Sequence, residues 1–298
     1  MKCFYSDHFV LPLPPKHHFP IQKYAMLHRT LRTEQIVEEA QLHPPPPVPL
    51  PFLLAAHCKE YVERVRLGQL SKHEVRRIGF PWSPALYERS IRVAGATIEA
   101  CKEALSAGIS VNLAGGTHHA SYDRGQGYCV FNDSAVAVRA LQAEHSIKRI
   151  LILDCDVHQG NGTAEIFADE PDVFTFSIHN HKAFPLHKAV SDLDIDVPPK
   201  TQDTAYLALL TQGLEEVFAR FSPECVIYLA GVDPYEDDRL GGLSLTKAGL
   251  AQRDHLVLRA CRERGLPVAI TMSGGYAHRI EDIVALHAQT IEIATGYI

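Results

Sequence analysis

The stretch RILILDCDVHQGNGT, residues 149–163, decides the fold prediction. Its four aliphatic residues, 150–153, are typical of a parallel strand buried on both faces. Alternate strand residues point to one side, which predicts that Asp154, Asp156 and His158 share a side near the strand's C-terminal end, where open α/β sheets bind ligands. Buried ionisable groups are tolerated when they pair or hold a metal. The spacing therefore predicts a metal site, and the preceding apolar run disfavours a chance D-x-D-x-H in a loop.

Apolar runs and amphipathic segments alternate along the rest of the chain. Strands are predicted at 2–5, 110–113, 150–154, 173–178, 225–229 and 268–272, and helices at 21–32, 55–67, 84–107, 134–144, 204–221, 246–264 and 278–294. The proline-rich segment 43–52 is predicted to be a stiff surface loop, and 68–84 a compact segment of turns. The alternation predicts an α/β fold with a mostly parallel central sheet and helices on both faces. Because no repeat or change in composition divides the chain, we predict one domain over 1–298.

Composition limits the functional classes. Hydrophobic residues make up 46% and charged residues 21% of the chain, as in ordinary globular proteins. The net charge of -6 argues against direct nucleic-acid binding, which needs a concentrated basic patch. Seven cysteines without a C-x-x-C pair are typical of a reducing compartment, and no stretch approaches the roughly 20 apolar residues that span a bilayer. We therefore expect a cytoplasmic enzyme with no membrane or nucleic-acid partner.

Polar residues follow the other predicted strands as well. They are His118 and His119 after 110–113, His179 after 173–178, Asp233 after 225–229 and Tyr276 after 268–272, and the loop that follows His179 also contains the aromatic Phe184. Each cluster alone is ordinary loop composition. Together they predict one crevice, because the C-terminal ends of parallel strands meet at one edge of the sheet.

This set of residues is chemically coherent. Asp156, His158 and Asp233 would offer three ligands and an open position to a divalent ion, the pattern of a catalytic metal site. Such an ion activates water and polarises a carbonyl, and one of the adjacent histidines would move the water's proton to a leaving amine. The hydroxyl of Tyr276 would donate to the developing oxyanion. These roles predict amide hydrolysis, although the ligand types suit zinc, iron and cobalt alike.

At this point the chain resembles the zinc-dependent histone deacetylase family, which has the arginase/deacetylase fold. The similar segments are THHA at 117–120, GYCVFND at 127–133, DCDVHQGNGT at 154–163, FSIH at 176–179, SDLDI at 191–195, GVDP at 231–234 and SGGY at 273–276. They run in family order and span most of the chain. Segments 73–84 and 182–198 are similar to the bacterial and class IV branch. The resemblance implies removal of an acetyl or longer acyl group from the ε-amino group of lysine, in a protein or peptide.

The resemblance also implies roles for single residues around one zinc ion held by the three ligands above. The implied catalytic residues are His118, His119, Tyr276, Asp154 and Asn161. His119 would be the main general base and acid, with His118 as its electrostatic partner, and Tyr276 would polarise the substrate carbonyl. Asp154 would pair with His118, and Asn161 with His119. Some members carry aspartate in place of Asn161, so His119 should be a weaker base here than in those members.

A substrate channel and a second ion are further implications of the resemblance. The implied channel residues are Tyr128, Phe184, Gly127 and Gly275, of which the two aromatic ones would grip the methylene stem of acyl-lysine. A structural potassium ion would use main-chain oxygens together with Asp154 and Ser177. Many members carry an aspartate at Lys59 that clamps the substrate backbone. A lysine there would disfavour cationic polyamines, unless Glu60 takes over the role of the clamp.

Three other functions compete with lysine deacylation. The first is hydrolysis of acetylated polyamines or other small amides on the same scaffold. The second is a ureohydrolase of the arginase type, which usually needs a D-x-H-x-D ligand set, whereas Gly160 supplies no second side chain here. The third is a non-catalytic binding scaffold, which would have lost a catalytic residue. Because none is missing, a mononuclear hydrolase is the preferred prediction.

Overall fold

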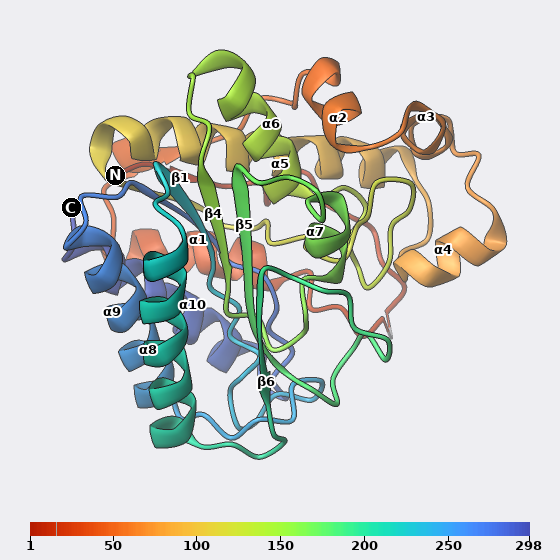
Figure 1. Ribbon diagram of the computed structural model, residues 1–298. Helices are drawn as coiled ribbons and strands as arrows, with labels where there is room; N and C mark the ends of the chain where they lie inside the picture. The colour runs from red at the N-terminus through yellow and green to blue at the C-terminus, as the bar shows by residue number, and fades with distance from the viewer. Residues whose placement is uncertain (16) are drawn as a thin grey trace.

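Strand β4, Ile150–Asp154, lies inside a sheet in which every pair of neighbouring strands is parallel. The computed structural model describes residues 1–15 and 17–298, and the strand order within them is β2-β1-β3-β8-β7-β4-β5-β6 (Figure 1). The other strands are β1 Cys3–Phe4, β2 Leu42–His43, β3 Ile109–Asn112, β5 Val173–Asn180, β6 Leu193–Val197, β7 Cys225–Leu229 and β8 Val268–Thr271.

Helices cover both faces of the sheet (Figure 1). They are α1 Lys23–Thr33, α2 Leu50–Ala56, α3 Lys59–Leu67, α4 Lys72–Ile78, α5 Pro84–Ala107, α6 Asp133–Glu144, α7 Asn161–Ile166, α8 Asp203–Arg220, α9 Lys247–Arg262 and α10 Ile280–Thr295. On one face α5 packs against α6, and on the other α1 packs against α10 while α9 lies between α8 and α10. The predicted α/β class, with a parallel sheet between two helical layers, is confirmed.

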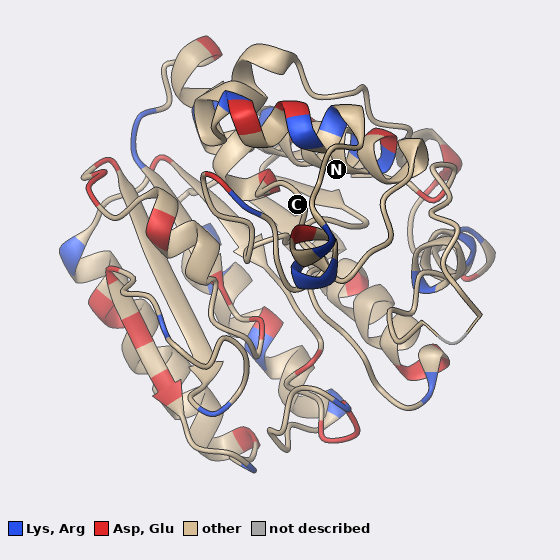
Figure 2. Cartoon of the chain, turned by 90° about the vertical axis from the view of Figure 1, so that its right-hand side faces the viewer, with Lys and Arg blue, Asp and Glu red and all other residues tan. Residues whose placement is uncertain are grey.

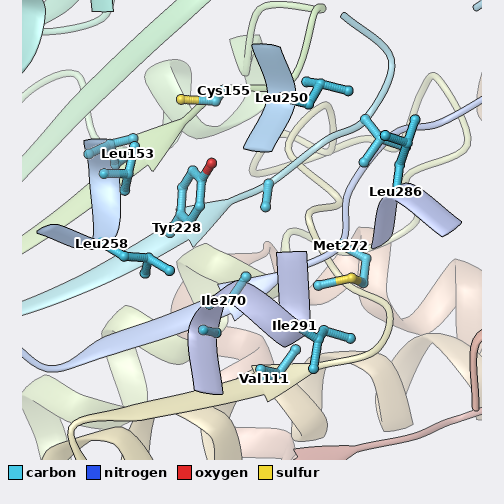
Figure 3. Packing of buried hydrophobic residues seen from close by; sticks show 14 of the residues in the cluster. Val111, Leu153, Cys155, Tyr228, Leu250, Leu258, Ile270, Met272, Leu286 and Ile291 are labelled. Atoms are coloured by element: carbon cyan, nitrogen blue, oxygen red, sulfur yellow. The ribbon is translucent and has the colours of Figure 1, made fainter. Parts of the chain in front are cut away.

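The aliphatic residues of β4 face alternate cores, which explains why the run is continuous. Ile150 and Ile152 pack into the core beneath α5 and α6, whereas Leu151 and Leu153 pack into the core beneath α8, α9 and α10. Figure 3 shows Leu153 beside Tyr228 of the neighbouring strand in this second core. Full burial of one such side chain stabilises a fold by roughly 1.5–3 kcal/mol, so a polar residue on either face would be costly.

The prediction of one helix over 55–67 is wrong in its first part, because the helix α3 begins only at Lys59. The prediction of a loop over 43–52 is wrong at its end, where α2 begins. Helix α2 already begins at Leu50 and ends at Ala56, because a proline in the first helical turn needs no backbone donor. The chain then breaks before α3. There the Nδ1 of His57 bonds the carbonyl oxygen of Ser121 over 2.9 Å, and the N–H of Cys58 donates to the carbonyl oxygen of Tyr122 over 2.8 Å. Long-range hydrogen bonds thus divide one apparent helix into two.

Helix α4 lies inside the segment that the sequence analysis assigned to turns. Its N-terminus is a capping box: the N–H of Glu74 donates to Ser71 Oγ over 3.2 Å, and the N–H of Ser71 donates to Glu74 Oε2 over 2.8 Å. The helix ends at Gly79, whose φ of 87° is the left-handed conformation that glycine adopts easily. The pattern SKHE followed by glycine was a readable signal. Short α7 and edge strand β6 were also missed.

The predicted ligand residues Asp156 and His158 do not lie on β4 itself. β4 ends at Asp154, so the expected strand alternation of Asp156 and His158 is wrong. Asp154 Oδ1 accepts the N–H of Asp156 over 3.0 Å, and Asp156 Oδ1 accepts the N–H of His158 over 2.9 Å. These side-chain bonds replace the sheet ladder and turn the chain.

The part of the chain that the structure describes contains no helix with both the length and the apolarity needed to cross a bilayer. All seven cysteines lie in this part and are unpaired. Cys155 and Cys225 are fully buried beside the central strands, as expected for small apolar side chains.

Candidate active site

The structure brings Asp156, His158 and Asp233 together at the C-terminal edge of the sheet. The first two follow β4, and Asp233 follows β7, which pairs directly with β4. His158 Nδ1 lies 3.0 Å from Asp156 Oδ1 and 3.2 Å from Asp233 Oδ2. One ligand atom from each residue lies within 4.8 Å of the others, and all three side chains are buried. The adjacency of the two strands explains how residues 75 or more positions apart meet.

These three side chains fit a divalent metal ion. Two ligand atoms, each about 2.0 Å from one tetrahedral ion, lie roughly 3.3 Å apart, close to the separations seen around His158. Asp233 Oδ2 is buried and has no hydrogen bond to any residue in the described chain. Burial and the neighbouring Asp156 carboxylate raise the pKa of Asp233 to about 7. A cation between the two carboxylates would remove this repulsion and stabilise both as anions.

The loop after β8 also contacts the cluster, by donating hydrogen bonds to Asp156. Asp156 Oδ2 accepts the hydroxyl of Ser273 over 2.7 Å and the N–H of Gly274 over 2.8 Å. A Cβ built on Gly274 would lie 1.9 Å from Asp233 Oδ2, so the backbone can approach both carboxylates only because this residue is glycine. Asp233 Oδ1 accepts the N–H of Val157 over 2.9 Å. Each carboxylate is thus oriented by groups outside the trio.

The adjacent histidines lie beside the ligand cluster and differ in charge. His118 Nδ1 is 2.6 Å from Asp154 Oδ2, and His119 Nδ1 is 2.8 Å from Asn161 Oδ1. Burial lowers the pKa of His118, but the carboxylates of Asp154 and Asp156 outweigh it and raise that pKa to about 9. Burial, followed by the positive charge of His118, holds the pKa of His119 well below its usual value. At neutral pH one imidazole is therefore charged and the other is neutral.

The hydrogen bond to Asn161 decides which nitrogen of His119 is free to act as a base. An amide oxygen only accepts, so the bonded Nδ1 of His119 carries the proton. Its Nε2 then keeps a lone pair, as a general base requires. The ring lines the same cavity as the three ligands.

Tyr276 lines this inner cavity of about 50 Å³ too. Burial, and then the carboxylates of Asp156 and Asp233, raise the pKa of its phenol well above the usual value, so the hydroxyl stays protonated and can donate. Two residues that the sequence analysis missed hold its backbone. Asp238 Oδ2 accepts the N–H of Tyr276 over 2.6 Å, and Arg239 Nε donates to its carbonyl oxygen over 2.8 Å. The charged run that follows the GVDP segment was the available signal.

An outer cavity of about 290 Å³ continues from the buried site toward the surface. Tyr128 and Phe184 line it, and the Phe184 ring centroid lies 4.8 Å from that of His119. Gly127 has a φ of 57° and lies against the rings of His119 and Phe184. A Cβ at this position would be 2.6 Å from His119 Cδ2 and 3.2 Å from Phe184 Cε1. Gly275 lines neither cavity. A Cβ at this position would be 2.7 Å from Cγ2 of the buried Val232. Gly274 lines the inner cavity in its place.

Two other predicted positions have different outcomes. Asp154 and Ser177 are direct register partners on β4 and β5, so the residues expected at a potassium site lie side by side. Ser177 Oγ is 2.9 Å from His179 Nδ1. Lys59 and Glu60, considered as a substrate clamp, are on α3 and line neither cavity. Among the helices near the outer cavity, the end of α4 contributes to its lining and α3 does not.

A buried ion pair beneath the ligands was not predicted. Arg253 on α9 is fully buried and pairs with Asp254, at 2.9 Å from Nε to Oδ1. Its Nη1 donates to the carbonyl oxygen of Gly231 and, over 3.5 Å, to that of Cys155. Gly231 and Cys155 precede Asp233 and Asp156, so one guanidinium joins the two ligand-bearing loops. An adjacent Arg and Asp in an amphipathic helix resemble surface charges in sequence, which is why the pair was missed.

Arg253→Met should destabilise the protein strongly. It leaves Asp254 buried without its cation, and the expected loss in unfolding free energy is about 3–5 kcal/mol. Combining it with Asp254→Leu removes the unpaired charge and should recover part of the loss, because the bonds to the Gly231 carbonyl and from the Tyr228 and Thr290 hydroxyls stay broken. Denaturant unfolding of the two variants measures both effects. A single variant as stable as the parent would show that the ion pair does not hold the loops together.

Comparison with known proteins places this chain in a family. The family model described as the histone deacetylase domain matches residues 17–291. An uncharacterized protein of Picosynechococcus sp. is 42% identical over 284 residues, or 95% of each chain. Histone deacetylase 2 of Arabidopsis thaliana is 29% identical over 278 residues, covering 90% of this chain and 72% of the relative.

Solved structures agree with the sequence comparisons. The crystal structure of an HDAC homolog from Aquifex aeolicus has a TM-score of 0.86 at 25% identity, covering 99% of this chain and 83% of that one. An HDAC homolog complexed with SAHA has a TM-score of 0.85 at 25% identity, covering 99% of this chain and 84% of that one. The family resemblance of the motifs is thus confirmed across nearly the whole chain. This protein belongs to the histone deacetylase family.

Proposed function

We propose that this protein hydrolyses the amide bond between an acyl group and the ε-amino group of lysine, with one zinc ion held by Asp156, His158 and Asp233. The observation that carries the proposal is the single buried cavity in which three metal-ligand side chains meet a neutral histidine and a protonated tyrosine. Three protein ligands with an open position are typical of catalytic zinc. The aromatic outer cavity suits the apolar stem of a lysine side chain.

The proposed reaction uses four residues of the chain. A bound zinc ion would supply Lewis acidity toward water and the substrate carbonyl. His119 Nε2 accepts a proton from the attacking water and returns it to the amine nitrogen as the C–N bond breaks. His118, held charged by Asp154, stabilises negative charge, while the Tyr276 hydroxyl donates to the carbonyl oxygen. The products are a carboxylic acid and a lysine amine, which leave as a carboxylate and an ammonium ion once the acid's proton has passed to the amine.

The proposal covers the whole chain, 1–298, as one catalytic domain. A structural potassium ion at Asp154 and Ser177 is included, supported by their register pairing on neighbouring strands. A cytoplasmic location is included as well, because seven unpaired cysteines suit a reducing compartment.

Turnover by the purified protein on acyl-lysine peptides and on acetylated polyamines tests the proposal. We expect cleavage of peptides that chelation stops and one equivalent of zinc restores. Cleavage of polyamines alone would assign the site to small-molecule metabolism. Two metal ions per chain would favour a binuclear site, and no turnover on either panel with zinc bound would favour a scaffold.

A further inference from the structure

The mouth of the outer cavity carries two adjacent arginines. Arg76 and Arg77, in the last turn of α4, line it opposite the apolar side chains of Phe184 and Leu240. In Figure 2 this side of the molecule faces the viewer, and α4, which lies at the right of Figure 1, is coloured blue at its Lys and Arg positions. The described residues that line this cavity include no carboxylate. The mouth is therefore locally positive in a protein whose net charge is -6.

Neither arginine is neutralised by its surroundings. In the described chain, Arg76 and Arg77 form no ion pair, and the buried Nε of Arg77 has no hydrogen-bond partner. The acidic residue of the same helix, Glu74, is already paired with Arg64 at 3.0 Å and caps the helix at Ser71. The two guanidinium groups are thus available to a ligand.

The acidic residue nearest Tyr276 in the loop after β7 does not cancel this charge. Asp238 points its carboxylate into the backbone, where it accepts N–H groups of Tyr276, Leu240 and Gly241. The neighbouring Arg239 bonds only main-chain carbonyl oxygens, those of Tyr276 and His18. Arg239 is therefore the charged group of this loop that bonds Tyr276 without being an acid, whereas Glu236 and Asp237 of the same loop line neither cavity.

The end of α4 is fixed against the channel wall. The N–H of Gly127 donates to the carbonyl oxygen of Arg77 over 3.1 Å, and the N–H of Tyr128 donates to that of Ile78 over 2.7 Å. Gly79 lies against the Tyr128 ring, and a Cβ there would be 2.8 Å from Cε1. The arginines consequently keep a set position relative to the acyl-lysine channel.

We infer that this mouth selects acyl-lysine within an acidic peptide segment and rejects polycationic amines, a specificity that rests on the proposed function. An extended peptide advances about 3.3 Å per residue, so side chains one or two positions from the lysine reach the rim of the channel. Consecutive helical residues project about 100° apart, which lets Arg76 and Arg77 meet different flanking positions. A carboxylate at either position gains a charge-assisted bond, whereas a polyamine tail meets like charge.

Three otherwise identical acyl-lysine peptides, flanked by glutamate, glycine or lysine, test this specificity. For the zinc-loaded parent we expect kcat/KM to fall from the Glu to the Gly to the Lys peptide by about three- to fivefold per step, mainly through KM, as for exposed charge pairs. The spread should shrink as ionic strength rises. Acetylated polyamines should be turned over no better than the Lys peptide.

Variants assign the effect to α4. Arg76→Glu brings the summed charge of the two positions from +2 to 0, so kcat/KM for the Glu and Lys peptides should come within about twofold of each other. Lys72→Glu makes the same charge change at the other end of α4 and should keep the parent's order. Arg77→Met retains the buried stem, removes one charge and should compress the spread without reversing it.

The peptides separate the two ways in which the idea could fail. No metal-dependent turnover of the Gly peptide would overturn the proposed function itself. Turnover of the Gly peptide with equal kcat/KM for the Glu and Lys peptides would leave the function standing and overturn the specificity. An equal loss of the preference in Lys72→Glu and Arg76→Glu would also overturn it, because long-range charge would then explain the preference.

Discussion

Asp156→Asn should leave the protein folded but unable to hold its metal or turn over substrate. Asparagine keeps the shape of the side chain and removes the anion that faces His158, with which Asp156 Oδ1 makes a 3.0 Å contact. Losing a group that merely orients a metal ligand costs about 10- to 100-fold, so losing a ligand should lower turnover by more than about 100-fold. Metal analysis after gel filtration should give well below one equivalent per chain.

A matched control for this prediction is Asp169→Asn, which makes the same chemical change at an exposed residue after α7. This control should bind one metal and retain activity. Circular dichroism of both variants should match the parent. Stoichiometric metal in Asp156→Asn would remove Asp156 from the ligand set.

Tyr276→Phe should separate catalysis from metal binding. The hydroxyl is held protonated in the cavity that the ligands line, and its loss removes one donor to the developing oxyanion. Loss of such a donor typically lowers kcat by about 10²- to 10³-fold. The metal content and the KM for an acyl-lysine peptide should change little, because the ring still fills its place.

Tyr297→Phe is a matched control for the hydroxyl, since Tyr297 lies beyond α10, contacts His255 and lines neither cavity. It should retain parental kcat. Unchanged kcat in Tyr276→Phe would exclude Tyr276 from the mechanism, and loss of metal would show that its role is structural.

The site was predictable where strand ends alone bring residues together. The apolar run of β4 predicted a buried parallel strand, and Asp233 follows the neighbouring strand β7. Even so, Asp156 and His158 reach their positions through side-chain hydrogen bonds in a bend, not through strand alternation. The structure brings the three predicted residues together, although the reason offered for the geometry of Asp156 and His158 was wrong.

Charged residues on helices were the least predictable part of the site. Arg253 and Asp254 appear in the sequence as two polar positions of a helix, yet both are buried beneath the ligand loops. Arg76 and Arg77 lie in α4, a helix that the sequence analysis did not predict. That analysis considered Lys59 as the charged residue near the substrate, but the outer cavity is lined by the two arginines instead. Pairing and exposure of a charge depend on segments far away in the chain, which local patterns do not record.

The sequence by itself determined the α/β class and the order of most strands and helices along the chain, and it singled out the three side chains that the structure brings into one cluster. Hydrophobic periodicity and strand-end polarity are local, so they can be read without a structure. Only the tertiary structure decided which histidine is neutral and which arginines line the outer cavity. It also showed that the backbone at Gly274 approaches Asp233 too closely for any residue with a Cβ. These features arise from contacts between segments that are distant in sequence, where burial and neighbouring charge set protonation and access.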